Sequence, residues 1–191
     1  MPYIQNALSF TVETILGLYL IIVILRFLFQ LFRVDFRNPV SQMVVMLTNP
    51  PLRVLRSFIP GLYGIDLSAI VLAIVIAMIK SALLLSLSGF GTDPAGILVL
   101  AIAEILKTGI WTLIIVILIS AVLSWVAPRS YHPVVGLING MSEPVLRPFR
   151  RVLPAMGGLD LSPLLALLVL NLAIRLLVAP LTDLARQLIL S

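Results

Sequence analysis

Apolar side chains fill long stretches of this chain, and polar residues interrupt them at only a few positions. A run of about 18 or more apolar residues with few charges is typical of a transmembrane helix. The pattern predicts four such spans, separated by segments richer in Pro, Arg and Gly. The predicted spans are residues 7–32, 67–87, 108–127 and 161–181.

A further apolar segment, residues 95–107, directly precedes the third span. One helix from residue 95 to residue 127 would be about 50 Å long at about 1.5 Å per residue, whereas the hydrocarbon core of a bilayer is about 30 Å thick. The segment is therefore expected to lie outside the core, to bend near Gly109, or to tilt strongly.

The polar segments between the spans repeat. The string "NPPLRVLRSFIPGLYGIDLS", residues 49–68, returns without a gap as "EPVLRPFRRVLPAMGGLDLS", residues 143–162, which lies 94 positions later. Each repeat holds two spans, so both repeats enter the membrane in the same orientation, which makes this a parallel repeat. We predict repeats over residues 1–94 and 95–191.

Each linker predicts a hairpin of two short amphipathic helices in the membrane interface. Apolar residues at helical spacing precede Pro50 and Pro144, and each proline would end one helix and begin the next. The second short helix has an apolar face and an arginine face, a pattern typical of interfacial helices that attract anionic lipid. The arginines are Arg53, Arg56, Arg147, Arg150 and Arg151. The expected fold is an all-α membrane protein with four transmembrane helices in two parallel repeats.

Asp66 and Asp160 directly precede the second span of each repeat. Aspartate is a favoured helix N-cap, so capping is one interpretation, and a carboxylate that binds a cation or a partner's arginine is the other. Two pairs of arginines recur in register, Arg53 with Arg147 and Arg56 with Arg150, and each pair predicts a defined contact, with these aspartates as candidate partners.

A few charges lie inside the spans. An ionisable residue there marks a functional site by default, but a long side chain near the end of a span can also reach the head groups. Under the first interpretation, charges within the spans form a small salt-bridge cluster with Glu104. Under the second, each of them contacts the head groups independently. The intramembrane charges are Glu13, Arg26, Lys80 and Arg175.

The amino-acid composition limits the kinds of chemical site that this chain can form. Hydrophobic residues make up 61% of the chain and charged residues 11%, whereas soluble domains carry about 25% charged residues. There is no cysteine and only one histidine, which excludes disulfides, iron–sulfur clusters and thiolate metal sites. No nucleophile lies beside a base, and no phosphate loop or metal-ligand spacing is present. We expect no enzymatic activity, no cofactor, no metal and no nucleic-acid partner.

The two linkers, "NPVSQMV…NPPLRVLRSFIPGLYGIDLSAIV" and "HPVVGLI…EPVLRPFRRVLPAMGGLDLSPLL", resemble those of the YggT family, called YlmG in Gram-positive bacteria. The chain is similar to the two-repeat, proteobacterial type. The resemblance implies a place in the bacterial inner (cytoplasmic) membrane. It also implies an association with cell division and envelope organisation, with osmotic or cation tolerance, or, as in plastid relatives, with assembly of a membrane cytochrome complex.

Arginine is concentrated in the linkers, so the positive-inside rule predicts that both linkers are cytoplasmic and both termini lie outside. Two hypotheses for function follow. The first is a non-enzymatic scaffold or assembly factor of the cell envelope that binds anionic lipid head groups and membrane-protein partners, and that can form a homo-oligomer. The second is a channel or transporter that affects cation or osmotic balance, which requires a polar path between the spans.

Overall fold

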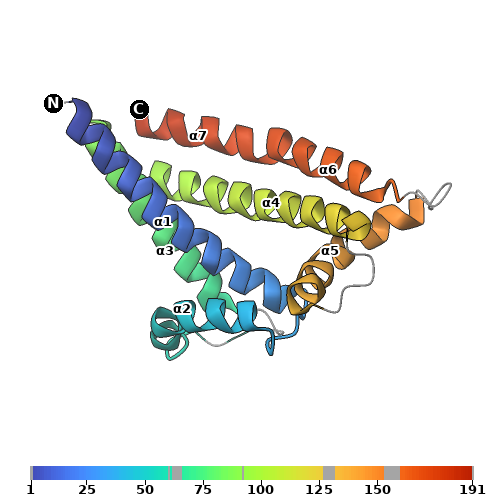
Figure 1. The fold of residues 1–191 in the computed structure, drawn as a ribbon. Coiled ribbons are helices and arrows are strands. Elements are labelled where there is room, and N and C mark those ends of the chain that lie inside the picture. The colour runs from blue at the N-terminus through green and yellow to red at the C-terminus, as the bar shows by residue number, and fades with distance from the viewer. Residues whose placement is uncertain are drawn as a thin grey trace.

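The structure is a computed structural model that describes residues 2–59, 61, 66–91, 93–126, 132–152 and 160–190. All its regular elements in these ranges are helical (Figure 1). They are α1 (Pro2–Leu31), α2 (Pro39–Leu55), α3 (Leu67–Leu87), α4 (Pro94–Val126), α5 (Pro133–Val152), α6 (Ser162–Ala173), the π-helical turn η1 (Ile174–Val178) and α7 (Ala179–Leu190).

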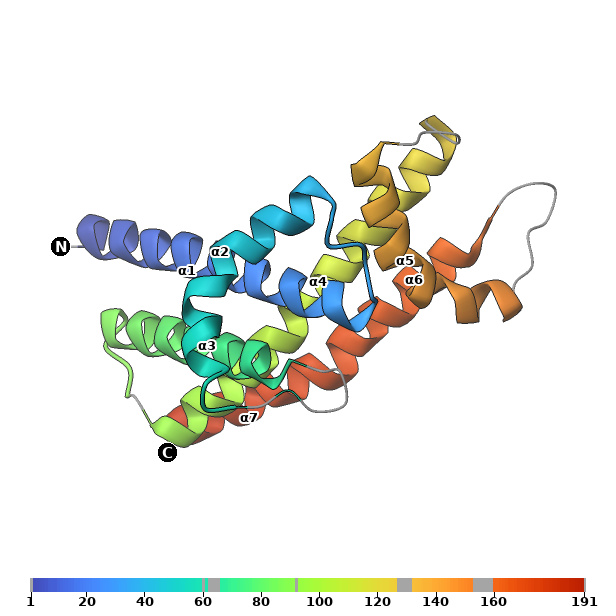
Figure 2. The ribbon, with the colours of Figure 1, turned by 90° about the horizontal axis from the view of Figure 1, so that it is seen from below.

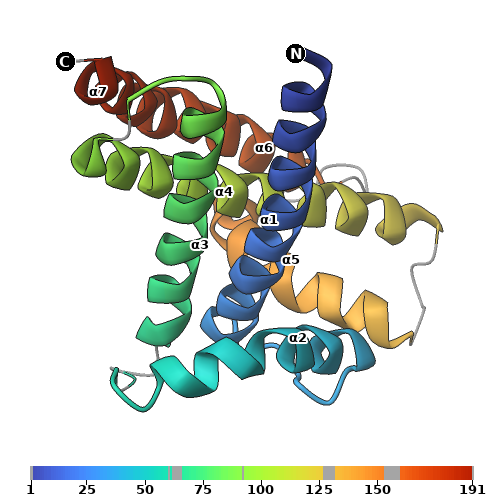
Figure 3. The same ribbon diagram turned by 90° about the vertical axis from the view of Figure 1, so that its left-hand side faces the viewer.

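Four helical segments of the described chain are long and apolar enough to cross a membrane, which confirms the predicted all-α membrane fold. They are α1, α3, α4 and the continuous rod α6–η1–α7. The spans of each repeat form an antiparallel pair, α1 with α3 and α4 with α7. The two pairs cross rather than stand parallel, and α4 contacts both spans of the first repeat (Figure 3).

The third span begins earlier than predicted. Helix α4 starts at Pro94, not near residue 108, and it continues through Gly109 without a break. Asp93 fixes this start because its carboxylate accepts a hydrogen bond from Gly96 N at 2.7 Å, and proline suits the first helical position. Since the two pairs cross, they cannot both stand upright in one bilayer. The expected strong tilt is compatible with these crossing pairs and with an uninterrupted α4, and it stays a prediction.

The fourth span also runs further than predicted, to Leu190, and it contains the π-helical turn η1. Pro180 has no N–H, so the helix cannot keep its ordinary bonding at this point. The N–H of Ala179 instead reaches back five residues to the carbonyl of Ile174. A π turn holds one more residue than an α turn. Arg175 in this turn lies one position beyond the repeat equivalent of Lys80, which matches that extra residue.

Small residues allow the paired spans to approach closely. On α3 the buried residues Ala69, Ala73 and Ala77 follow one another at intervals of four, and they pack in one core with Leu20 and Val23 of α1. The hydrophobic effect does not drive helices together within a membrane. Small residues let the helix backbones approach closely, so van der Waals packing holds the helices together. The second pair uses Gly96, where an added Cβ would lie 2.6 Å from Ile189 Cγ1 of α7.

Each linker holds one bent helix, so the predicted hairpin of two short helices is wrong in this detail. Helix α2 contains Pro50 and Pro51, helix α5 contains Pro144 and Pro148, and both bend along their length (Figure 2). The prolines remove backbone hydrogen bonds but do not end either helix, and one of the freed carbonyls has another partner. Pro51 leaves the carbonyl of Leu47 without its helical donor, and the hydroxyl of Tyr19 on α1 donates to it at 3.3 Å.

The two linkers meet at one end of the molecule, as a parallel repeat requires. The side-chain amide of Asn38, at the start of α2, donates to the carbonyl of Pro133, at the start of α5. We call this the linker end. Both termini and the α3–α4 connection lie at the opposite side of the molecule, which we call the terminal end (Figure 1).

Candidate functional site

An arginine–aspartate latch closes each linker at the linker end. Arg56 of α2 forms an ion pair with Asp66, and the equivalent Arg150 of α5 donates from Nε to Asp160 Oδ2 at 2.9 Å. Arg150 also pairs with Glu143. Two of the recurring arginines thus make the contact that the repeat predicted. Each latch ties a linker helix to the first residues of the following span.

The predicted capping role of the aspartates is wrong for the side chain of Asp66. This residue occupies the N-cap position of α3, but its carboxylate makes no capping hydrogen bond and is taken up by Arg56. Asp66 is only 5% exposed, and a buried carboxylate needs a countercharge more than a neutral N–H. Asp160 stands one residue before the N-cap of α6, and its Oδ1 accepts from the backbone N–H of Ser162 at 2.9 Å.

The second latch is electrostatically stable at neutral pH. Burial alone raises the pKa of Asp160, but hydrogen bonds from Ser162 and Arg150 together outweigh burial and hold that pKa below its ordinary value. Burial likewise lowers the pKa of Arg150, and its bonds to Asp160 and Glu143 more than reverse this, so its pKa is raised. Both groups therefore stay charged and paired.

The remaining linker arginines have a different environment. Arg53, Arg147 and Arg151 are exposed, and no ion pair joins them to any other residue that the structure describes. The five predicted arginines thus divide into two that hold the linkers in place and three that extend from the linker end.

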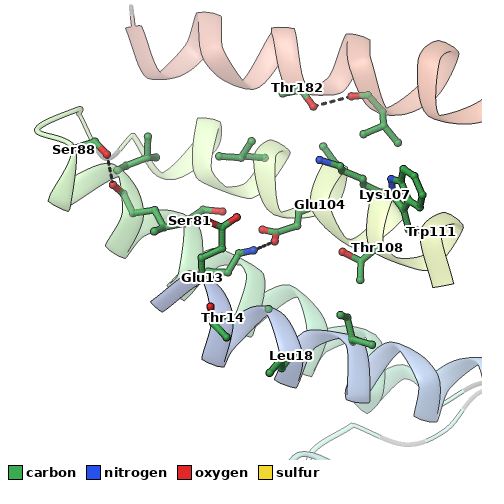
Figure 4. Close-up of a pocket in the computed structure, with 18 of the residues that line it drawn as sticks. Glu13, Thr14, Leu18, Ser81, Ser88, Glu104, Lys107, Thr108, Trp111 and Thr182 are labelled. Carbon is green, nitrogen blue, oxygen red and sulfur yellow. Dashed lines mark hydrogen bonds and ion pairs between the residues drawn. The ribbon is translucent and has the colours of Figure 1, made fainter. Parts of the chain in front are cut away.

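A charged cavity lies between the spans toward the terminal end. It has a volume of about 710 Å³ and is bounded by α1, α3, α4 and the η1–α7 segment (Figure 4). Lys80 forms an ion pair with Glu104, and both side chains are largely buried. Glu13 and Lys107 line the same cavity, so two acids and two bases face one another there. Hydroxyl groups complete the polar lining and come from Thr14, Ser81, Ser88, Thr108 and Thr182.

The predicted salt-bridge cluster exists only in part. Lys80, Glu104 and Glu13 lie together at the cavity, whereas Arg175 is exposed on η1 and takes no part in an ion pair with the described residues. Sequence reasoning missed Lys107 as a cavity residue. One signal in the sequence points to the actual arrangement, because Lys107 is the repeat equivalent of Glu13.

The cavity does not continue to the linker end through the described core. Large buried side chains of α1 fill its contact with α3 and α4 on that side, among them Leu20, Val23, Ile24, Leu28 and Phe29. The described residues also contain no group of three or more His, Asp or Glu placed to hold a metal ion.

Arg26 is covered by the first linker. Its residue is only 9% exposed, and its guanidinium carbon lies 5.4 Å from the centre of the Phe36 ring. Its Nε and Nη1 are buried without a hydrogen-bond partner. A second cavity, of about 680 Å³, lies beside it between α1 and α2. The expectation that Arg26 extends independently to the head groups is therefore wrong, because the linker folds over its side chain.

Bacterial proteins with similar sequences align with most of this chain, and a plastid protein aligns with a shorter part of it. Uncharacterized protein PA0392 of Pseudomonas aeruginosa is 43% identical over 171 residues, covering 88% of this chain and 87% of that protein. Uncharacterized protein YggT of Escherichia coli strain K12 is 36% identical over 168 residues, covering 87% and 86%. YlmG homolog protein 2, chloroplastic, of Arabidopsis thaliana is 41% identical over 56 residues, covering 29% and 22%. No solved structure matches the chain.

The family comparison also follows the repeat. The model described as CCB3/YggT matches residues 5–87 and again residues 99–181, so one match falls in each repeat. These matches include both latches and the greater part of each of the four spans. With bacterial relatives aligned along most of its length, the chain belongs to the CCB3/YggT family.

Proposed function

We propose that this multi-pass membrane protein is a non-enzymatic scaffold or assembly factor of the bacterial cell envelope. It would reside in the inner membrane with both linkers cytoplasmic and both termini outside. The observation that carries the proposal is that three exposed linker arginines form no ion pair with a described residue: Arg53 near the end of α2, and Arg147 and Arg151 near the end of α5. The latches tie both linker helices to the following spans, so these arginines have fixed places in the fold.

The chemistry of the linker end suits an anionic membrane surface and acidic protein segments. A basic residue near such a surface contributes about 1 kcal/mol, so three contribute about 3 kcal/mol. Helix α2 also exposes large apolar side chains, among them Met43, Met46 and Val54, which can enter the interface beside the arginines. Partners of the scaffold would therefore be anionic lipids together with membrane proteins that carry acidic cytoplasmic segments.

The test replaces the exposed arginines and leaves the latches intact. In the variant Arg53→Glu/Arg147→Glu/Arg151→Glu, crosslinking in native membranes followed by purification should recover fewer protein partners and less anionic lipid than the wild type. The matched control changes the same positions to lysine, which keeps the charge. Unchanged recovery of partners and lipid from the glutamate variant, with the protein still inserted, would refute the scaffold.

A second candidate function is passage or binding of a small ion, and the charged cavity favours it. Ionisable residues within a membrane commonly mark ion pathways. In a single copy, however, the core closes the cavity toward the linker end, so a complete path requires more than this chain alone. The discriminating measurement is ion flux in vesicles that contain only this protein. A saturable flux altered by Lys80→Ala, and unaffected by the arginine changes, would support passage over the scaffold.

A further inference from the structure

Arg26 is the charged group of the structure that most clearly lacks a counterpart. Its Nε and Nη1 donate to no acceptor among the residues that the structure describes, although its residue is nine-tenths buried. Buried charges in proteins are as a rule paired and hydrogen-bonded, so an uncompensated guanidinium indicates a missing partner. Nearby Arg56 does not change this balance, because its charge is neutralised by Asp66. One net positive charge therefore remains at Arg26.

The cavity beside Arg26 has the lining of an anion site. Arg26 and Arg56 face it from α1 and the end of α2, and the amide side chains of Gln42 and Asn49 add further hydrogen-bonding groups. Val45 and Met46 line the same cavity, and Met46 is 68% exposed, so the site has an apolar margin that opens outward. Guanidinium donors combined with amides are the groups that proteins use to bind phosphate oxygens.

The second repeat provides an internal comparison. The residue equivalent to Arg26 is Ser120, which is also buried. Ser142 donates to Ser120 Oγ at 3.0 Å, and Asn139 Oδ1 lies 3.4 Å from that oxygen. In the second repeat, neutral groups of the chain therefore hydrogen-bond the residue at this position. In the first repeat, the same position carries a charge whose Nε and Nη1 have no hydrogen-bond partner among the described residues. The two repeats have diverged at this site.

We propose that the cavity between α1 and α2 binds the phosphate group of one anionic phospholipid, with Arg26 as the central contact. A phosphate diester supplies the single negative charge and the acceptor oxygens that Arg26 lacks. Val45 and Met46 form an apolar margin that an acyl chain can contact, and this favours a lipid over free phosphate as the ligand. The site uses other residues than the exposed arginines of the proposed scaffold, so each can fail without the other.

The test measures lipid binding to the purified protein in neutral detergent. Short-chain phosphatidylglycerol should bind saturably and raise the melting temperature, whereas short-chain phosphatidylcholine and inorganic phosphate should not. Arg26→Ser, which copies the second repeat, should weaken binding at least tenfold. The matched control, Arg186→Ser, should bind as the wild type does, because Arg186 is exposed on α7 and belongs neither to the cavity nor to the linker arginines.

Three results would overturn the proposal. Equal binding of phosphatidylglycerol to Arg26→Ser and to the wild type would exclude Arg26 as the contact. An equal effect of inorganic phosphate would identify a free-anion site, and an equal effect of phosphatidylcholine would remove the need for net charge. If Arg26→Ser does not fold, Arg26→Lys keeps the charge but presents fewer donors, and wild-type affinity in that variant would also count against the site.

A different observation concerns two exposed charges within the spans, one of which, Glu13, lies at the open margin of the charged cavity. Glu13 of α1 and Arg175 of η1 are exposed, and neither forms an ion pair with a described residue. Inside the chain, the second span of the first repeat packs on the first span of the second repeat through Lys80 and Glu104. Arg175 corresponds to Lys80 once the extra residue of the π turn is counted, and Glu13 lies one turn beyond the equivalent of Glu104.

We infer that a second copy of this chain packs against the first copy in the way that the second repeat packs against the first repeat. Its α1 would pack against α6–η1–α7 of the first copy, as α4 packs against α3 inside the chain, and Glu13 of the second copy would pair with Arg175. The charge complementarity and the repetition of the internal interface both favour a copy of the chain over a different protein. This contact is heterologous, so closure into a ring fixes the number of copies.

The absence of cysteine allows a direct test. Two differently tagged chains, one with Glu13→Cys and one with Arg175→Cys, should give a mixed disulfide-linked dimer when expressed together. Leu118→Cys, exposed on α4, is the control that should not link to either. Charge reversal at Glu13 or at Arg175 should reduce dimer recovery, and reversal of both in one chain should restore it. No mixed dimer, or linkage only within a chain that carries both cysteines, would refute the contact.

Discussion

The ion pair between Lys80 and Glu104 provides the sharpest test of the packing between the two repeats. Lys80 is 8% exposed and lies deep in a span, so removal of its partner leaves a charge with little access to water. Two charges about 4 Å apart attract by about 4 kcal/mol at an effective dielectric constant of about 20. Loss of one member of a buried pair generally costs about 3–5 kcal/mol, whereas an apolar replacement of both is close to neutral.

We therefore expect Glu104→Gln to reduce the free energy of unfolding by about 3 kcal/mol. This value is the lower end of the range for buried pairs, because the neighbouring cavity can admit water. Lys80→Met combined with Glu104→Leu should lie within about 1 kcal/mol of the wild type, so the double-mutant cycle should show coupling of about 2 kcal/mol or more. The assay is equilibrium unfolding in mixed detergent micelles, followed by tryptophan fluorescence.

If Lys80→Met alone and Glu104→Leu alone, the single variants of the cycle, instead fall within about 0.5 kcal/mol of the wild type, the pair behaves as a surface ion pair. The reasoning would then be wrong, because it requires that the pair is shielded from water. The matched control is Glu13→Gln. Glu13 lines the same cavity but forms no ion pair with the described residues, so its loss should change the free energy of unfolding by less than about 1 kcal/mol.

Three further predictions concern other parts of the molecule. Gly96→Ala should destabilise the protein by about 1–3 kcal/mol in the same unfolding assay, because the new Cβ meets Ile189 and the backbone of α7; wild-type stability would contradict the close contact. The lowered pKa of Asp160 means that the stability it contributes is complete above its unfolded pKa of about 3.9 and is lost as pH falls through the lower folded pKa. The difference in free energy of unfolding between wild type and Asp160→Asn should therefore stay constant from pH 7 to about pH 5 and shrink below about pH 4, and a constant difference down to pH 3 would argue against the latch. For topology, Ser57→Cys and Arg151→Cys should resist an impermeant thiol reagent added to intact cells, while Ser88→Cys and Asp93→Cys should react; the reverse pattern would invert the orientation.

The sequence alone determined the helices, the repeat and the family of this protein. Long apolar runs can satisfy their backbone groups in a bilayer only as helices, so the four spans follow from local pattern. The doubled proline–arginine–aspartate string located both linkers and predicted contacts between recurring arginines and the aspartates, which Arg56 and Arg150 make and Arg53 and Arg147 do not. These features depend on residues close together in the chain.

Only the tertiary structure decided which charges meet and which remain without a partner. Lys80 pairs with Glu104 because the α3–α4 connection brings α3 and α4 side by side, whereas Arg175 is exposed on η1 and forms no ion pair with a described residue. Arg26 resembles an ordinary charge near the end of a span, but α2 folds over it and buries it without a partner. These outcomes depend on the crossing of two helix pairs and on the bend of a linker helix, which arise from contacts between distant residues and leave no local periodicity in the sequence.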